Sequence, residues 1–273
     1  MRLERLCYLP PGECLLPLNP GGGLDCSTRR ALLVDRFEVT RGEWRVFRLE
    51  HGLAPAPGAA HPRASDRWPA AWMSRAEARR FAQGEGMRLL TAREWLRVAA
   101  GTRAQRWPWS SQDAESVTNS LDLGLGHPTG AGSFPLGATT AGVHDLLGNV
   151  SEWVDGELGS LQENEADAWT LGGSFLDHKR PIYGSGRIEG LVVAGETVEP
   201  DQRSIDVGLR LCADAEDYLL DRLRGLQPNA EERARLVAVG EFWGVAARPL
   251  LAELVARPDA PPALADLLEG ARR

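Results

Sequence analysis

The sequence predicts a domain of mixed helices and strands over residues 1–213, followed by a helical extension over residues 214–273. Two observations predict the first part: short apolar stretches with strand-like alternation, and three Ser/Thr-x-x-Glu capping boxes that each begin a helix. A third observation, leucines at helical spacing after Asp214, predicts the extension. With 273 residues, 43% of them hydrophobic, the chain can bury one large core and an appendage.

Three helices are predicted to begin after Thr40, Ser74 and Thr91. In a capping box the hydroxyl accepts a hydrogen bond from the backbone amide three residues later, and a glutamate at that position reaches back. Glu43, Glu77 and Glu94 occupy those positions. Apolar side chains then recur on one face of each helix, so all three are expected to pack on the core.

Strands are predicted at residues 31–39, 169–175 and 206–213, the second with a kink at Gly172-Gly173. Residues 1–30 predict one short strand and a loop. Residues 110–142 are rich in Gly, Ser, Thr and Pro, which predicts a long irregular loop. Loops of this length within a compact domain are often functional.

The extension predicts several amphipathic helices. Leu219, Leu220, Leu223 and Leu226 have helical spacing, and Asn229 can cap a second helix. A third stretch spans residues 250–255, and prolines at 258–262 separate it from a last short helix. We expect the extension to pack on the main domain or on a partner protein.

Composition excludes several classes of function. The net charge of -7 argues against a general nucleic-acid-binding protein. The N-terminus lacks the apolar region of a secretion signal, and no run approaches the roughly 18 apolar residues of a membrane span. The expectation is a cytoplasmic protein that does not interact with membranes. Cys7, Cys14, Cys26 and Cys212 are too scattered for a disulfide scaffold or a zinc site, so reduced thiols are expected.

An unusual segment joins a glycine and an asparagine to a carboxylate that lies next to a tryptophan: Gly148-Asn149-Val150-Ser151-Glu152-Trp153. Glycine and asparagine tolerate left-handed backbone, so a sharp bend is expected at Gly148-Asn149. A bend can direct several carbonyl oxygens to one side, and Glu152 could add a carboxylate, as calcium sites require. Alternatively, the segment is a tight turn in which Glu152 pairs with an arginine and Trp153 enters the core.

The order of several motifs resembles that of the formylglycine-generating enzyme, or sulfatase-modifying factor, family. The motifs are Leu9-Pro10-Pro11-Gly12, Val34-Asp35-Arg36-Phe37-Glu38-Val39-Thr40, Met87-Arg88-Leu89-Leu90-Thr91-Ala92-Arg93-Glu94-Trp95, Trp107-Pro108-Trp109, Gly132-Ser133-Phe134-Pro135, Leu147-Gly148-Asn149-Val150-Ser151-Glu152-Trp153, Gly172-Gly173-Ser174-Phe175 and Gly208-Leu209-Arg210-Leu211. The resemblance implies an α+β, C-type-lectin-like fold with little regular secondary structure. It also implies structural calcium, held by main-chain oxygens of Leu147, Gly148 and Val150 and by the carboxylate of Glu152.

The family's chemistry requires residues that this chain lacks at the matching positions. The resemblance implies oxidation of a substrate cysteine to formylglycine by a copper ion held by two cysteines after the Gly-Gly-Ser strand. Aligned without gaps, those two positions fall near Ile182 and Arg187. Neither side chain can ligate Cu(I), which selects thiolates. Copper is therefore not expected.

The leading hypothesis is a non-catalytic binding or regulatory protein that recognises a protein partner or ligand. Residues 110–142, residues 176–205 and the helical extension would form its recognition surface, with Asp177, His178, Tyr183 and Arg187 as candidate ligand contacts. Relatives of this kind occur in signalling and defence systems. Two alternatives stay open: an enzyme of different chemistry, or true formylglycine generation. The first could use four side chains as metal ligands or acid–base groups, namely Asp177, His178, Asp155 and His144.

Overall fold

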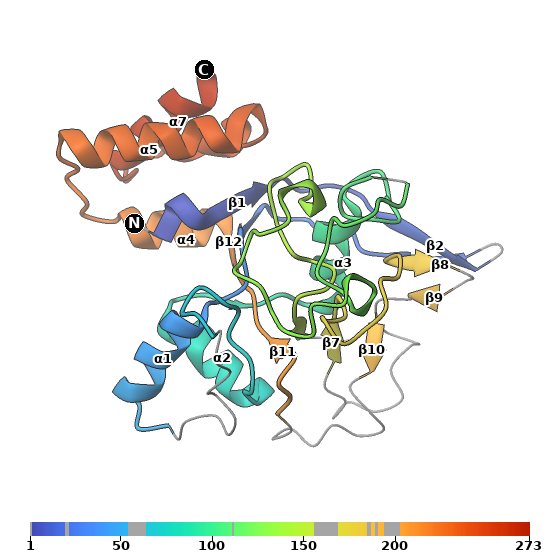
Figure 1. The fold of residues 1–273 in the computed structure, drawn as a ribbon. Coiled ribbons are helices and arrows are strands. Elements are labelled where there is room, and N and C mark those ends of the chain that lie inside the picture. Colours follow the sequence, from blue (N-terminus) through green and yellow to red (C-terminus); the bar gives the residue numbers. More distant parts are fainter. Residues whose placement is uncertain are drawn as a thin grey trace. The chain divides into compact units, whose positions relative to one another are not determined.

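The computed structural model describes residues 2–19, 22–53, 64–110, 112–155, 169–184, 187–188, 191–193 and 203–273. These residues form two compact units (Figure 1). The helical unit comprises residues 1–12, 29–36 and 212–273, and the loop-rich unit comprises residues 13–28 and 37–211. The helical extension thus shares a unit with two N-terminal segments, while the domain boundary expected at residues 213/214 stays a prediction.

The helical unit begins with the short 3-10 helix η1 (Arg2–Arg5) and contains three strands, β1 (Leu6–Leu9), β4 (Leu32–Asp35) and β12 (Leu211–Asp214). β4 lies between the other two, and both pairings are antiparallel. Val34 faces Cys7 on one side and Cys212 on the other. All four residues of β1 and of β4 are buried, so these strands form part of the core.

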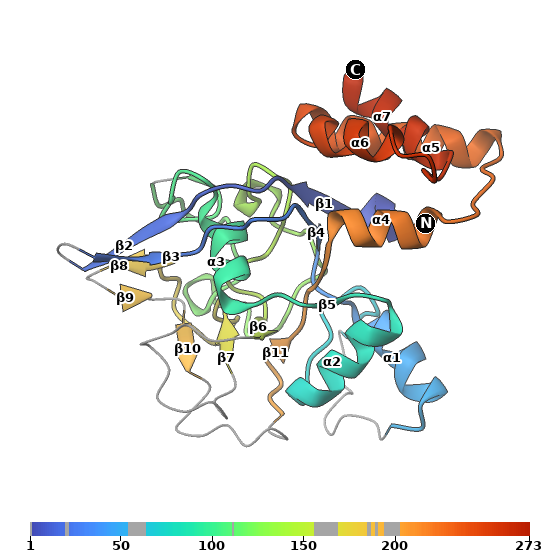
Figure 2. The ribbon, with the colours of Figure 1, turned by 180° about the vertical axis from the view of Figure 1, so that it is seen from behind.

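The helices of this unit follow the sequence prediction closely. They are α4 (Ala215–Leu223), α5 (Ala230–Trp243), η5 (Gly244–Ala246), α6 (Arg248–Val255) and α7 (Ala263–Arg272). Asn229 caps α5 through a complete capping box with Glu232. α5, α6 and α7 pack as one group (Figure 2). The Trp243 indole donates a hydrogen bond to the Leu6 carbonyl oxygen at 2.7 Å, so the extension packs on its own chain.

All three predicted capping boxes of the loop-rich unit are present. They begin α1 (Arg41–Glu50), α2 (Arg75–Gly84) and α3 (Ala92–Ala100), and in each box both reciprocal hydrogen bonds are formed. Trp44, Phe47 and Phe81 are buried and pack with one another. None of the helices within the described ranges has the length and apolarity needed to cross a bilayer.

The strands of this unit are short. A four-stranded sheet has the order β10 (Leu191–Val193), β7 (Trp169–Leu171), β6 (Ser151–Val154), β11 (Val207–Gly208). Two hairpins pair β2 (Leu15–Asn19) with β3 (Gly22–Asp25) and β8 (Tyr183–Gly184) with β9 (Arg187–Ile188), and β5 is Arg88–Leu89. Between residues 110 and 142, the described residues contain only η2 (Leu121–Leu123) and η3 (Pro135–Gly137) as regular elements, as the loop prediction anticipated.

Four expectations about strands need correction. The strand expected at residues 31–39 ends at Asp35, the strand expected at 169–175 ends at Leu171, and the strand expected at 206–213 is divided into β11 and β12. The first of these strands ends in a bend at Arg36-Phe37, and the last is interrupted at Leu209-Arg210, where the buried Arg210 side chain needs a partner that a ladder cannot supply. Residues 1–30 contain the β2–β3 hairpin in addition to β1, because a glycine-rich sequence can form a strand when its other face is buried.

Candidate functional site

The segment predicted to bend does so in the left-handed region. Asp145, Gly148 and Asn149 have φ angles of 56°, 77° and 60°. A side chain at Gly148 would place Cβ 2.4 Å from the Asn119 carbonyl oxygen, so only glycine fits there. The amide of Asn149 donates to that same oxygen at 2.7 Å. The bend is therefore held directly against the loop of residues 110–142.

Glu152 lies directly after the bend, on β6, and both oxygens of its carboxylate accept hydrogen bonds. Arg210 donates to Oε1 from Nη2 at 2.6 Å and from Nε at 3.0 Å. The Trp95 indole donates to Oε2 at 2.8 Å. Because Glu152 and Arg210 are each about 1% exposed, this is a buried and bidentate ion pair.

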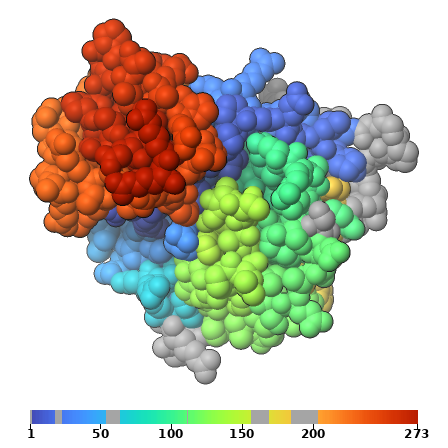
Figure 3. Space-filling view, turned by 90° about the horizontal axis from the view of Figure 1, so that it is seen from above, coloured from blue at the N-terminus to red at the C-terminus, as the bar shows by residue number. Residues whose placement is uncertain are grey.

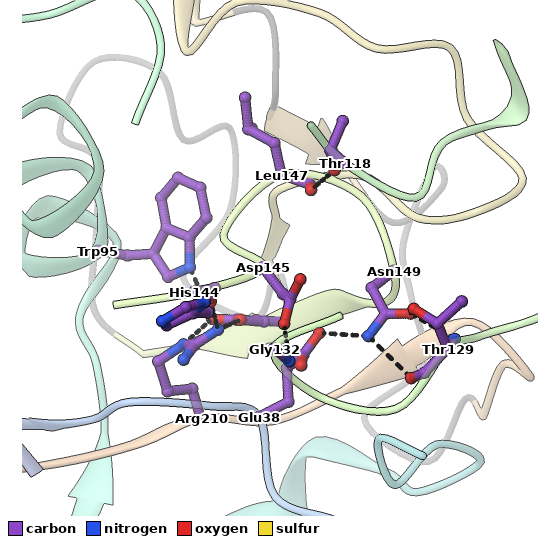
Figure 4. Close-up of polar contacts among 11 residues, drawn as sticks. Glu38, Trp95, Thr118, Thr129, Gly132, His144, Asp145, Leu147, Asn149 and Arg210 are labelled. Atoms are coloured by element: carbon purple, nitrogen blue, oxygen red, sulfur yellow. Dashed lines mark hydrogen bonds and ion pairs between the residues drawn. The ribbon is translucent and has the colours of Figure 1, made fainter. Parts of the chain in front are cut away.

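Two further carboxylates surround this pair. Asn149 donates from Nδ2 to Oε1 of Glu38 at 3.1 Å, and the Gly132 amide donates to Oδ2 of Asp145 at 2.6 Å (Figure 4). Oε2 of Glu38 is buried without a hydrogen-bond partner among the described residues. We call Glu38, Asp145, Asn149, Glu152 and Arg210 the polar knot.

The charges of the polar knot are unbalanced: three carboxylates face one guanidinium. Burial is the largest cause that raises the pKa of Glu38 well above its usual range, and the nearby Asp145 carboxylate adds to it. Burial likewise raises the pKa of Asp145 from 3.8 to about 6, although the Gly132 amide and Arg210 oppose the shift. Glu38 therefore favours its protonated, neutral form, which reduces the cost of the buried excess charge.

The implied calcium ligands do not fit this arrangement. Calcium requires about six to eight oxygens, including charged carboxylates. Both oxygens of Glu152 already accept hydrogen bonds from Arg210 or Trp95, and the Leu147 carbonyl oxygen accepts one from the Thr118 hydroxyl. No group of three His, Cys, Asp or Glu side chains suited to a metal occurs within the described ranges. The geometry favours the alternative of an ion pair with arginine, and calcium binding at Leu147, Gly148, Val150 and Glu152 stays a prediction.

Sequence reasoning missed Glu38, Asp145 and Arg210 as members of this site. Glu38 lies between Phe37 and Val39, and Arg210 lies between Leu209 and Leu211. Both segments were interpreted only as strands, without a role for their charged residues. A charge of each sign, flanked on both sides by large apolar residues, was the available signal for a buried pair.

The two loops predicted to form a recognition surface meet in the structure. The Leu121 amide donates to the Asp177 carbonyl oxygen at 2.8 Å. Asp122 accepts a hydrogen bond from the Lys179 amide at 2.7 Å and pairs with Nδ1 of His178 at 2.7 Å. This contact leaves Leu121, Leu125 and Leu176 between 41% and 46% exposed. Residues 194–202 of the second loop lie outside the described residues.

The positions that match the copper ligands are filled differently. Ile182 is buried, with its amide bonded to the Arg106 carbonyl oxygen at 2.7 Å, and Arg187 lies on β9. The Tyr183 hydroxyl donates to the Ala104 carbonyl oxygen at 2.6 Å. Burial raises the pKa of Tyr183, Arg106 lowers it, and Cys14 raises it further. Strand β2, which directly follows Cys14, packs against β8, so one thiol lies near this segment.

The side chains considered for other chemistry do not converge. Asp177 accepts hydrogen bonds from the amide and hydroxyl of Ser174, and His178 pairs with Asp122. Asp155 pairs with Arg79 at 2.7 Å, whereas the His144 ring packs on Phe37 with ring centroids 5.0 Å apart and planes tilted by 41°. Each has a partner of its own.

Comparison with known proteins gives matches of two kinds. The chain is 32% identical over 95 residues to hercynine oxygenase from Mycobacterium tuberculosis, a match that spans 33% of this chain and 22% of that protein. It is 33% identical over 87 residues to hercynine oxygenase from Mycolicibacterium smegmatis, which spans 30% and 20%. The matched part is thus about a fifth of the length of these curated relatives.

Solved structures match over a larger share. PvdO from Pseudomonas aeruginosa superposes with a TM-score of 0.58 at 20% identity, covering 77% of this chain and 94% of that one. CarF superposes at 0.55 and 17% identity, covering 77% and 99%. Treponema denticola variable protein 1 superposes at 0.55 and 15% identity, covering 77% and 94%. These likenesses show the fold and confirm the expected α+β class.

The family model of the sulfatase-modifying factor enzyme 1-like domain matches residues 8–215, about three quarters of the chain. It covers the loop-rich core from the first strand to the start of the helical extension. The motifs that suggested the resemblance lie within this range. The chain therefore belongs to the sulfatase-modifying factor, or formylglycine-generating enzyme-like, family.

Proposed function

We propose that this family member is a binding or regulatory module that recognises a protein partner. The observation that carries the proposal is the contact between residues 120–125 and 176–179, two segments separated by about fifty residues of sequence. The Leu121 amide and the Asp122 carboxylate, through their hydrogen bonds to residues 177–179, fix both segments to each other. A fixed loop surface on a stable core suits recognition.

The chemistry of this surface favours a protein partner. Leu121, Leu125 and Leu176 are exposed apolar side chains, and Asp122 and His178 beside them are polar and exposed. Lys179 holds the preceding loop through an ion pair with Asp113 at 2.6 Å and a cation–π contact with Trp107 at 5.5 Å. Apolar residues rimmed by polar ones are the composition typical of a protein interface. Loop 110–142, coloured green, occupies a continuous part of the surface (Figure 3).

A partner-capture experiment tests the proposal. Tagged full-length protein is compared with the double variant Leu121→Asp/Leu176→Asp and with Leu49→Asp, a matched control at an exposed leucine of α1. We expect one or more host proteins, identified by mass spectrometry, to bind the wild type and the control but not the double variant. Each host protein identified in this way, once purified, must also bind the wild type and Leu49→Asp more tightly than the double variant. Equal binding by all three forms would contradict the assignment of the surface.

A second candidate is an oxidising enzyme, because the curated relatives are named oxygenases, and the family resemblance would make a cysteine thiol its substrate. Cys14 directly precedes β2, and β2 packs against β8, so a thiol lies near the segment that matches the copper site. The discriminating measurement combines Cu(I) competition against a chromogenic chelator with oxygen uptake on a cysteine-containing peptide. We expect neither stoichiometric copper binding nor loss of the peptide thiol. Aldehyde formation on the peptide would replace the first proposal by this one.

A further inference from the structure

Two of the four cysteines face each other across the β2–β3 hairpin. Leu15 faces Asp25 and Leu16 faces Leu24, so the register continues to Cys14 opposite Cys26. The Cys26 amide donates to the Cys14 carbonyl oxygen at 2.8 Å, which confirms that the two residues are paired. They are twelve positions apart in sequence yet are direct cross-strand neighbours.

The two thiols lie on one face of the hairpin. Cys14, Leu16, Leu24 and Cys26 are buried, whereas Glu13, Leu15, Asp25 and Ser27 are exposed. Side chains directly opposed on antiparallel strands point to the same face, with Cα atoms about 4.5–5.5 Å apart. A disulfide requires a Cα separation of about 4.4–6.8 Å. The hairpin therefore meets the distance condition for a disulfide without any movement of the backbone.

The other two cysteines provide an internal contrast. Cys7 and Cys212 both face Val34, one from each side of β4. They are thus separated by two strand spacings, which amounts to about 9–10 Å. That separation exceeds the reach of a disulfide. Burial is similar for all four thiols, so only the strand pairing distinguishes the two pairs.

We propose that Cys14 and Cys26 are a site of reversible oxidation, where a small disulfide oxidant converts the two thiols into a cross-strand disulfide. One protein thiolate attacks the oxidant, forms a mixed disulfide and releases one small thiol. The second thiolate then attacks the protein sulfur of the mixed disulfide and releases the other small thiol. Two protein thiols are oxidised and one small disulfide is reduced, while the protons pass to solvent and the released thiolates.

The surroundings determine which thiol reacts first and how fast. Burial raises the pKa of both thiols, that of Cys26 to about 12; Arg97 opposes the rise at Cys14, and at Cys26 the Cys14 thiol adds to the rise while Arg93 opposes it. Cys14 is therefore the expected first attacker. Because both sulfur atoms face the interior, oxidation requires a transient opening of the hairpin. β8 and β9 lie beside this hairpin, so the disulfide would cross-link it next to the segment that includes Tyr183 (Figure 2).

Peptide mapping of the full chain tests the proposal. The protein is incubated with oxidised glutathione, alkylated in denaturant and digested without reduction. Trypsin leaves Cys7, Cys14 and Cys26 in one peptide, so cleavage after Glu13 and before Asp25 is needed to separate them. We expect peptides 14–24 and 25–34 to be joined, while Cys7 and Cys212 stay alkylated. Alkylation of all four cysteines after prolonged oxidation would overturn the proposal, as would a link between Cys7 and Cys212 that forms equally fast.

A stability measurement supplies a second criterion. A disulfide that closes residues 14–26 restricts the unfolded chain, so oxidation should raise the urea midpoint of the wild type. Dithiothreitol should reverse the rise. Cys14→Ser, which keeps the size and polarity of the side chain close to those of cysteine, should show no oxidation-dependent shift. An identical shift in wild type and variant would assign the effect to another cysteine and reject this site.

Discussion

The polar knot and the contact between α5 and α7 are both buried, but different forces stabilise them. In the knot, backbone without regular structure is held by charged and amide side chains, chiefly Glu152, Arg210 and Asn149. In the helix pair, the backbones themselves touch at two glycines, Gly240 and Gly270. The difference follows from hydrogen bonding. A helix satisfies its own backbone groups, whereas an irregular loop needs side chains to do so.

Removing Arg210 should give the largest loss of stability, because it breaks the buried ion pair on which the polar knot, unlike the helix pair, depends. Arg210→Met leaves the Glu152 carboxylate buried without its partner, which typically costs about 3–5 kcal/mol. We expect the urea unfolding midpoint to fall accordingly. Arg79→Met is the control, because it breaks a half-exposed ion pair with Asp155 and should cost less than about 1 kcal/mol. Equal losses in the two variants would show that Glu152 is better solvated than its burial indicates.

The pH dependence of stability should come from the knot and not from the helices. The folded-state pKa of Asp145 is about 6, above its usual 3.8, so the folded protein binds this proton more tightly than the unfolded chain. The stabilisation is complete below about pH 4 and is lost as the pH rises through about 6, by at most roughly 3 kcal/mol.

Urea midpoints measured from pH 4 to 7 on wild type and Asp145→Asn check this sign. The wild type should lose stability relative to the variant across that window. Glu38 titrates in the same direction, so Glu38→Gln should remove a further part of the slope. A wild type that gains stability relative to Asp145→Asn as the pH rises would contradict the assignment.

Adding a methyl group at the helix crossing should destabilise the helical unit moderately. A Cβ at Gly270 would lie 1.9 Å from the Val237 carbonyl oxygen, and one at Gly240 would lie 2.0 Å from that of Leu267. Either glycine-to-alanine change must push α5 and α7 apart, at a cost of about 1–3 kcal/mol. Gly84→Ala in α2 is the control, since its Cβ meets only the Phe47 ring at 3.4 Å. Thermal unfolding followed by circular dichroism should show a decrease for the crossing variants alone.

Calcium should have the smallest effect. Because Arg210 and Trp95 occupy the Glu152 carboxylate, we expect added calcium or a chelator to leave the thermal midpoint nearly unchanged. Elemental analysis of the purified protein provides an independent measurement. A marked rise of the midpoint with calcium would show that the ion displaces the guanidinium, and would restore the ligand set that the family resemblance implies.

Local sequence signals predicted the helices of both units well. Ser74, Thr91 and Asn229 each begin a helix as expected, because a capping box is complete within four residues. The strands were predicted less well, since the ends of β4 and β11 depend on partners distant in sequence. Of the site, the sequence anticipated the bend at Gly148-Asn149 and a shared surface of loops 110–142 and 176–205, but not the partners of Glu152 and Asp122.

The sequence alone determined the family, the helices and the irregular character of the core, because ordered motifs and local capping encode them. Tertiary structure decided how each charge is satisfied. Glu152 could have faced a cation or an arginine, and only the fold places Arg210, 58 residues away, within hydrogen-bonding distance. It likewise decided that Cys14 lies opposite Cys26, while Cys7 and Cys212 are kept apart. Pairing across strands depends on register, and one sequence read locally does not specify register.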